Sequence, residues 1–190
     1  MKKKIAFIFP GQGSQKIGMG RDLFDNHSSG REVFQKIDEA LNDNLSNLIF
    51  NGDEKDLELT RNTQPALLAV SMAIIKVLEN ELKIKTEDLV KVVFGHSLGE
   101  YSALSSINCL GLESAAQILR IRGDAMQESV INRETAMVAV LGLDIEKIES
   151  LLLEVDCDKD EICEIANDNC PGQIILSGTK KAVEIVCEQL

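Results

Sequence analysis

The chain has 190 residues, of which 44% are hydrophobic and only 4% aromatic, with no tryptophan. A chain of this size can bury an aliphatic core in one large domain, alone or with a small second one, and its composition argues against disorder. Its 31 acidic side chains outnumber the 20 basic ones, giving a net charge of −11. This excess argues against a nucleic-acid binder, which needs clustered basic residues to neutralise phosphates.

The five cysteines indicate neither a metal site nor a disulfide framework. Their number is odd, no two of them form a C-x-x-C pair, and no histidine lies near the last four. We therefore expect reduced thiols in a cytoplasmic protein without a bound metal. The basic start followed by residues 5–9 imitates a secretion signal, but its apolar run is shorter than the roughly 7–15 residues of such a signal. No stretch is apolar enough to span a bilayer, so we expect no membrane association.

Two continuous apolar runs in the first half of the chain predict buried parallel strands. Residues 5–9 form the first and end at a Pro-Gly pair, and residues 90–94 form the second and end at Gly95. Runs that are apolar on both faces are typical of a parallel sheet covered by helices. The sequence therefore predicts an α/β fold.

Helical patterns surround these strands. Thr63 offers an N-cap and Pro65 a first turn for a long apolar helix over residues 66–82. We predict further helices over residues 31–41, from about residue 100, and over 113–130.

The last third of the chain has a different pattern. Its order, β-α-β-β-α, is that of a ferredoxin-like unit without its last strand. The predicted elements cover residues 136–143, 145–155, 162–167, 174–177 and 180–190. A sheet that stops there has an unpaired edge, so we expect the natural protein to continue. We place the boundary between the two parts at residues 132 and 133.

The strongest chemical signal is Gly95-His96-Ser97-Leu98-Gly99, a G-x-S-x-G pattern between a predicted strand and a predicted helix. A sharp strand-to-helix turn leaves no room for side chains beside the serine, and it exposes the hydroxyl at the carboxyl end of the sheet. We predict that Ser97 is a nucleophile and that the Leu98 N–H is the first donor of an oxyanion hole. The alternative is an ordinary glycine-rich turn in which the serine caps the helix.

A second glycine-rich loop, Pro10-Gly11-Gln12-Gly13-Ser14-Gln15, follows the first predicted strand. If the two strands are parallel, this loop opens at the same sheet edge as Ser97, and its backbone can approach a ligand closely. Nucleotide binding is disfavoured, because Lys16 occupies the third glycine position of G-x-G-x-x-G and no phosphate-binding loop motif is present. The alternative to a second oxyanion donor is a plain tight turn.

Arg122 is the most informative charged residue. It falls in the middle of an apolar stripe on its predicted helix, whereas Arg120 falls on the polar side. The stripe consists of Ala115, Ile118, Leu119, Ala125 and Met126. A buried guanidinium needs an anionic partner, and its planar fork suits a carboxylate. The partner is either a substrate carboxylate or a structural one such as Glu100, and the pattern alone leaves both open.

The sequence contains no complete catalytic triad. His27 and His96 are its only histidines. His96 adjoins the predicted nucleophile, but neighbouring side chains diverge at such a turn, so we interpret it as structural. His27 lies in a polar loop. Because a serine without a base is a weak nucleophile, the site is incomplete as written.

Several spaced motifs carry a family resemblance. They are Phe9-Pro10-Gly11-Gln12-Gly13-Ser14-Gln15, Thr63-Gln64-Pro65-Ala66, Gly95-His96-Ser97-Leu98-Gly99-Glu100-Tyr101-Ser102-Ala103, Arg122-Gly123 and Asn169-Cys170-Pro171-Gly172-Gln173. In this order, over essentially the whole chain, they resemble the malonyl-CoA:acyl-carrier-protein transacylases of bacterial fatty-acid synthesis. The resemblance implies an α/β-hydrolase-like large subdomain, present here as residues 1–132, with a ferredoxin-like small subdomain over residues 133–190.

The resemblance also implies a ping-pong reaction. Ser97 would take a malonyl group from coenzyme A and pass it to the phosphopantetheine thiol of acyl carrier protein. The backbone amides of Gln12 and Leu98 would form the oxyanion hole. Arg122 would bind the malonyl carboxylate, with Gln12 and Gln64 as further substrate-binding residues. The coenzyme A thioester would be a substrate, no cofactor would be bound, and we expect a monomer.

The chain departs from the family pattern at its end. The catalytic histidine of the family lies in an S-H-x-x-L-M-like segment after the small subdomain, and this segment is not in the sequence. We therefore expect a fragment that is nearly inactive by itself. Two other interpretations are a serine hydrolase, either an esterase or a thioesterase, and a non-catalytic module that binds acyl-CoA or carrier protein.

Overall fold

A computed structural model describes residues 4–130, 134–155, 158 and 160–190, and the structural statements below concern these residues. They divide into two compact units with a boundary between Ser129 and Val130. Both units combine helices with a small sheet, which confirms the predicted α/β class. No helix in the described ranges is both long and apolar enough to cross a membrane.

The sheet of the first unit consists of two parallel strands. β1 (Ala6–Phe9) pairs with β2 (Val92–Gly95), and Phe9 lies opposite Gly95 in the register. Both predicted strands are present, although the second begins two residues later than expected because a short helix, α6 (Thr86–Leu89), precedes it. The expectation that they are buried on both faces is wrong, because Ile8 is 68% exposed and Phe94 is 45% exposed. Because the strands are parallel, the two loops that follow them leave the sheet at the same edge.

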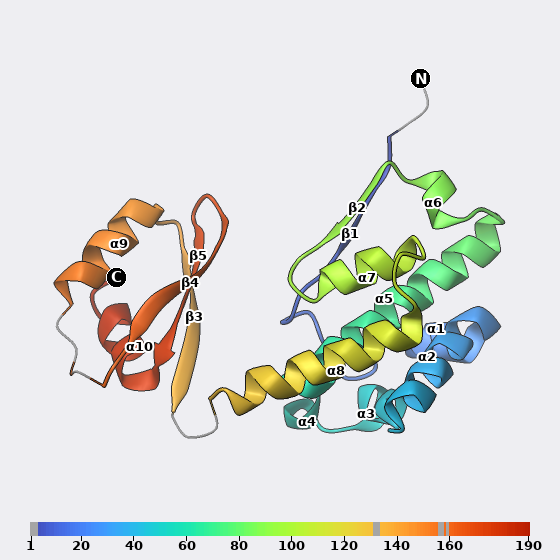
Figure 1. Ribbon diagram of the computed structural model, residues 1–190, viewed down its shortest axis with the longest axis horizontal. Helices are drawn as coiled ribbons and strands as arrows, with labels where there is room; N and C mark the ends of the chain where they lie inside the picture. The colour runs from blue at the N-terminus through green and yellow to red at the C-terminus, as the bar shows by residue number, and fades with distance from the viewer. Residues whose placement is uncertain (1–3, 131–133, 156–157, 159) are drawn as a thin grey trace. The chain divides into compact units, whose positions relative to one another are not determined.

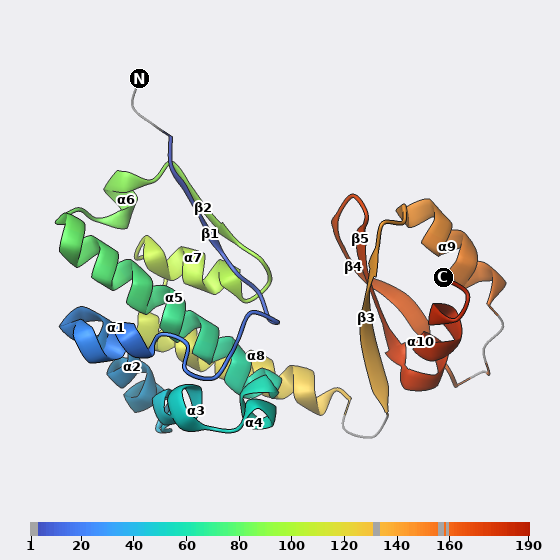
Figure 2. The ribbon, with the colours of Figure 1, turned by 180° about the vertical axis from the view of Figure 1, so that it is seen from behind.

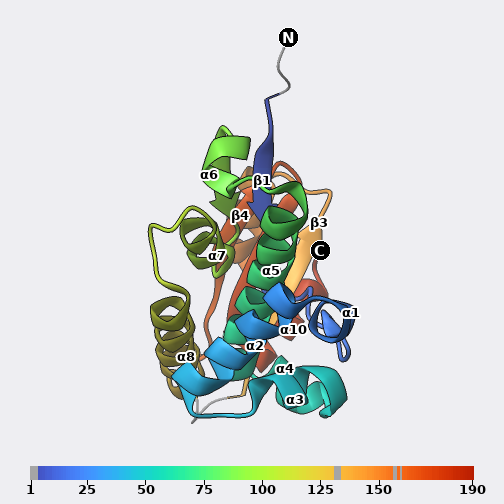
Figure 3. The same cartoon turned by 90° about the vertical axis from the view of Figure 1, so that its right-hand side faces the viewer.

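The remaining helices of the first unit lie on one side of this strand pair (Figures 1 and 2). They are α1 (Arg21–Asn26), α2 (Ser28–Leu41), α3 (Leu45–Asn51), α4 (Glu54–Glu58), α5 (Thr60–Leu82), α7 (Gly99–Ser106) and α8 (Leu112–Glu128). α5 packs against α2 and α8, which also contact each other (Figures 1 and 2). α7 packs against both strands and against α8 (Figure 3). The core between these elements is aliphatic, and Leu68, Met72 and Leu119 are among its fully buried side chains.

The start of α5 differs from the prediction. The proposed N-cap at Thr63 is wrong, because the helix already begins at Thr60. The amides of Asn62 and Thr63 donate to the Leu59 carbonyl at 2.8 and 2.9 Å, so the first turn is closed before Thr63. Pro65 consequently lies inside the helix, and Gln64 becomes a fully buried interior residue.

The second unit has a three-stranded antiparallel sheet in the order β3-β5-β4. The predicted element order is present, and most boundaries agree within a few residues. The elements are β3 (Thr135–Leu141), α9 (Ile145–Glu154), β4 (Cys163–Cys170), β5 (Gln173–Thr179) and α10 (Lys180–Cys187). Ile148 on α9 and Val186 on α10 pack with Ile174 and Leu176 of β5 into a core that belongs to this unit alone.

A buried carboxylate joins α5 to α6. Glu79 accepts a hydrogen bond from Lys76 Nζ at 2.8 Å and another from the Thr86 amide at 2.9 Å. Burial alone would raise the pKa of Glu79, but the hydrogen bonds from Lys76 and Thr86 outweigh it and lower the pKa below its ordinary value of 4.5. The ionised form is therefore the one that the fold stabilises.

We expect Glu79→Gln to lower the free energy of unfolding at pH 7 by about 1 kcal/mol, since it removes a charge-assisted contact. Because the folded-state pKa is lowered, this contribution exists above the ordinary value and disappears as the pH falls through the folded-state pKa. The difference between wild type and variant in urea unfolding should therefore vanish in acid. The exposed Glu58→Gln is the matched control, and an equal loss there would contradict the assignment.

Candidate active site

Ser97 stands at a strained turn between β2 and α7. Its φ angle is +52°, in the left-handed region that a serine rarely adopts. The neighbouring Leu98 is buried and holds the turn in place, whereas Ser97 itself is exposed. The strain therefore directs the hydroxyl outward at the edge of the sheet, as a nucleophile elbow requires.

The glycines of this turn are required by backbone contacts. A Cβ atom at Gly95 would lie 2.0 Å from the carbonyl carbon of Gly99, and one at Gly99 would lie 2.4 Å from the carbonyl oxygen of Phe9. No side chain fits at such distances. The turn therefore folds back on itself, and the start of α7 rests on the end of β1.

The loop after β1 lies against the serine turn, as the sequence predicted for parallel strands. The His96 amide donates to the Phe9 carbonyl at 3.0 Å. The His96 ring also covers Gly11, where a Cβ atom would lie 2.4 Å from Nδ1. Gln12 follows directly and is tied to the start of α5 by a hydrogen bond from its Nε2 to Thr60 Oγ1 at 3.3 Å. The two glycine-rich motifs thus form one continuous surface.

Backbone amides gather at this surface. Those of the three residues after Leu98 donate to carbonyls three residues earlier, at 2.9 to 3.1 Å. Leu98 precedes this ladder, so its amide belongs to the group at a helix start that has no intrahelical acceptor. Together with the positive end of the α7 dipole, it is suited to stabilise a negative oxygen beside Ser97.

Arg122 of α8 points at Ser97. Its Nη2 donates to Ser97 Oγ at 3.0 Å, and its Nη1 donates to Gln64 Oε1 at 2.6 Å. Both partners are neutral. Within the described part of the chain no carboxylate lies at ion-pair distance from Arg122, so the alternative salt bridge to Glu100 is not formed.

The buried face of α8 differs from the predicted stripe. It is formed by Ala115, Ala116, Leu119 and Gly123. Ile118, Ala125 and Met126, which we had placed on it, are exposed. The reason is the close approach of α5, since a Cβ atom at Gly123 would lie 2.5 Å from the Arg61 Cα. Arg122 therefore stands at the margin of the buried face and not in its middle.

Arg120 is the structural arginine that sequence reasoning missed. Only 14% of its side chain is exposed, and Nη2 lies 2.8 Å from Asp43 Oδ2. Its Nη1 donates to Asn62 Oδ1 at 3.1 Å. The pattern within the helix placed Arg120 on its polar side. The buried ion pair could not be recognised from that pattern, because the carboxylate partner comes from a loop distant in sequence.

The two histidines lie in different surroundings. His27 lies between α1 and α2, with Nδ1 3.7 Å from Glu81 Oε1. His96 turns Nδ1 towards Gly11. The hydroxyl of Ser97 accepts from the guanidinium of Arg122, a group that only donates hydrogen bonds. The described residues therefore bring together a candidate nucleophile, a guanidinium and candidate oxyanion donors.

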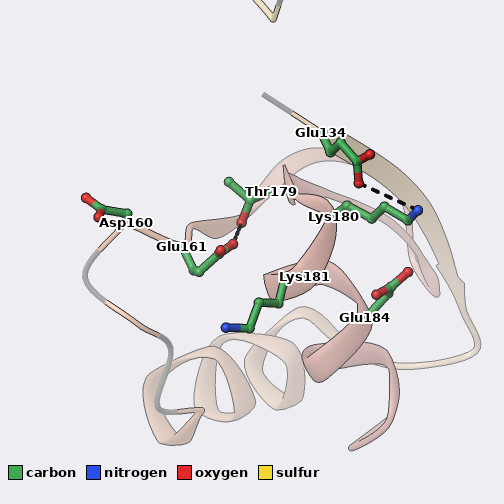
Figure 4. Close-up of a pocket in the computed structure, with 7 residues that line it drawn as sticks. All are labelled: Glu134, Asp160, Glu161, Thr179, Lys180, Lys181 and Glu184. Carbon is green, nitrogen blue, oxygen red and sulfur yellow. Dashed lines mark hydrogen bonds and ion pairs between the residues drawn. The ribbon is translucent and has the colours of Figure 1, made fainter. Parts of the chain in front are cut away.

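A cavity of about 730 Å³ in the second unit is lined mainly by charged side chains, namely those of Glu134, Asp160, Glu161, Thr179, Lys180, Lys181 and Glu184. Figure 4 shows its charges already interacting, with Lys180 3.8 Å from Glu134 and Thr179 hydrogen-bonded to Glu161. In the described residues no three His, Cys, Asp or Glu side chains are grouped to hold a metal.

Comparison with known protein families shows which family the chain belongs to. The family model described as acyl transferase domain matches residues 6–190. The chain belongs to the acyl transferase domain family. The malonyl CoA-acyl carrier protein transacylase of Bacillus subtilis (strain 168) is 44% identical over 186 residues, which cover 97% of this chain and 56% of that protein. The protein of the same name from Staphylococcus aureus (strain MSSA476) is 40% identical, with 98% and 58% covered.

Solved structures agree with this membership. The acyl-carrier-protein-S-malonyltransferase of Bartonella henselae superposes with a TM-score of 0.90 at 49% identity, covering 98% of this chain and 59% of that one. A type II PKS acyl-carrier protein in complex with its malonyl-transacylase gives a TM-score of 0.86 at 38% identity, with 98% and 58% covered. The chain thus spans a little over half the length of these relatives.

We expect Gly95→Ala to destabilise the first unit by about 3 kcal/mol or more, because the methyl group would meet backbone that cannot move aside. Gly111→Ala is the matched control, since the nearest atom to its Cβ would be Ser114 Oγ at 3.9 Å. Because Gly111 is the N-cap of α8, Gly111→Ala should lower the free energy of unfolding by only about 1 kcal/mol. Urea unfolding of both variants measures the difference, and equal losses would refute the packing argument.

Proposed function

We propose that the chain carries the nucleophile and the acyl-recognition part of a malonyl-CoA:acyl-carrier-protein transacylase. One observation supports this most directly, the hydrogen bond of 3.0 Å from Arg122 Nη2 to Ser97 Oγ. In a malonyl thioester only one methylene separates the carboxylate from the reacting carbonyl. A group that binds this carboxylate must therefore lie within a few ångströms of the nucleophile, as Arg122 does. Relatives named as malonyl transacylases support the same substrate.

The proposed reaction has two halves. Ser97 Oγ forms a bond to the thioester carbonyl carbon, the carbon–sulfur bond breaks, and coenzyme A leaves as its thiol with the serine proton. The phosphopantetheine thiol of acyl carrier protein then attacks the ester, and Ser97 regains a proton. The amides of Gln12 and Leu98 are the proposed donors to the oxyanion in both halves, because their loops meet at Ser97.

We also propose an identity for each of the two subdomains, a cellular location and an oligomeric state. Residues 1–132 form the α/β-hydrolase-like subdomain and residues 133–190 a ferredoxin-like one, of which the strand order β3-β5-β4 is the support. We propose a cytoplasmic monomer that uses the coenzyme A thioester as substrate without a cofactor. A serine hydrolase would share the elbow but would have no use for a guanidinium at its nucleophile.

Intact-mass measurement tests the acyl-serine intermediate. After brief exposure to malonyl-CoA, the natural gene product should gain one malonyl group, and acyl carrier protein should remove it. Ser97→Ala should gain none, because no other residue in the proposal accepts the acyl group. Release of the group to water faster than to carrier protein would favour a hydrolase, and an adduct that survives in Ser97→Ala would exclude Ser97 as its carrier.

Arg122→Ala tests the carboxylate clamp. Loss of a charge-assisted contact should reduce the rate of Ser97 malonylation about 10- to 100-fold at subsaturating malonyl-CoA. Acetylation by acetyl-CoA, which has no carboxylate, should change far less. Arg120→Ala is the control, since it removes an arginine of the same helix that is paired with Asp43. Equal losses for both acyl groups in Arg122→Ala would show that Arg122 is structural.

A further inference from the structure

Gln64 is a fully buried amide that Arg122 and Met126 hold at both ends. Its Oε1 accepts from Arg122 Nη1 at 2.6 Å, and its Nε2 donates to Met126 Sδ at 3.4 Å. None of its surface is exposed. Both partners belong to α8, whereas Gln64 belongs to α5, so the contact crosses the interface between the two helices.

The amide can take only one orientation here. Arg122 and Met126 are four residues apart and therefore lie one turn apart on the same side of α8. A guanidinium can only donate, and a thioether sulfur can only accept. Turning the amide over would place two donors against each other at Arg122 and two acceptors against each other at Met126. α8 therefore fixes the direction of the Gln64 carbonyl.

The two contacts of Arg122 differ in how easily they are replaced. Gln64 is buried and has no alternative partner in water, so losing its bond to Nη1 would leave a buried polar group unsatisfied. Ser97 is exposed, and water or a ligand oxygen can replace its hydroxyl at Nη2. One half of the guanidinium is therefore fixed to the protein, while the other half stays available at the nucleophile.

We propose that Gln64 is a positioning residue for acyl selection: it holds Arg122 with one edge directed at Ser97 before the substrate arrives. The inference rests on the proposed function and refines it. The neutral charge of Gln64 is part of the role, because a glutamate there would neutralise the guanidinium and compete with the substrate carboxylate. The family resemblance implied that Gln64 binds substrate, but its amide is fully buried and engaged at both ends, so we propose that it acts on the substrate through Arg122 instead.

The role makes a specific kinetic prediction. In Gln64→Leu the guanidinium is no longer fixed, so the half-saturating concentration of malonyl-CoA for Ser97 acylation should rise about tenfold. The maximal rate should change little, and acetylation should stay near the wild-type value. In Gln64→Glu the amide-sized side chain and the bond to Arg122 remain, but the malonyl preference should still fall, because the charge of Arg122 is compensated.

The experiment compares malonylation and acetylation of Ser97 by intact mass over a range of acyl-CoA concentrations, using the natural gene product. Gln117→Leu is the matched control, since it removes another glutamine of this helix bundle, one that donates to the Ala40 carbonyl. A lower malonyl-to-acetyl ratio in both Gln64 variants, with the control unchanged, is the expected result. An unchanged ratio in either folded variant, or equal losses for both acyl groups, would overturn the positioning role.

Two further outcomes are distinguishable. If Gln64→Leu does not unfold cooperatively, Gln64→Met replaces it, because methionine keeps the length of the side chain and, like leucine, offers Arg122 no carboxamide oxygen. If the wild-type protein is not malonylated at Ser97, the proposed function itself fails. A wild type that is malonylated with variants that keep its selectivity would refute only the inference about Gln64.

Discussion

The backbone contact between the end of β1 and the turn after β2 is the constraint on which the site depends. The His96 amide is bonded to the Phe9 carbonyl, and Gly99 has no room for a side chain beside that same oxygen. These backbone contacts bring the loop that contains Gln12 to the turn of Ser97, and the His96 ring over Gly11 and the bond from Gln12 to Thr60 add to them. The strained φ angle of Ser97 is tolerated because the backbone on both sides is already fixed.

A second close approach, between α5 and α8, brings the recognition residues to this turn. Gly123 lets α8 come to the backbone of Arg61, and this approach buries Gln64 between the helices. Arg122 lies next to Gly123 and is thereby carried to the margin of the interface, where it reaches both Gln64 and Ser97. The chemistry of the site thus results from two glycine-dependent contacts that meet at one hydroxyl.

Local pattern and tertiary packing explain what the sequence could and could not predict. The two strands and the serine turn were predictable, because apolar runs and flanking glycines within a few residues of sequence are enough to indicate them. The start of α5 and the buried face of α8 were not. Thr63 is a good cap by type, yet its hydroxyl donates to the Leu57 carbonyl inside the unit. The face of α8 is set by where α5 approaches, which periodicity within α8 alone cannot reveal.

Charge compensation distinguishes Arg122 from its neighbours on the same helix pair. Arg61 lies 3.2 Å from Asp124, and Arg120 lies 2.8 Å from Asp43, so carboxylates of the chain compensate both. Arg122 is surrounded by a hydroxyl and an amide instead, in a chain whose net charge is −11. In the proposed function, this guanidinium beside an exposed serine is available to an anion from outside. The neutrality of Gln64 and Ser97 is then as important to the proposed recognition as the positive charge of Arg122.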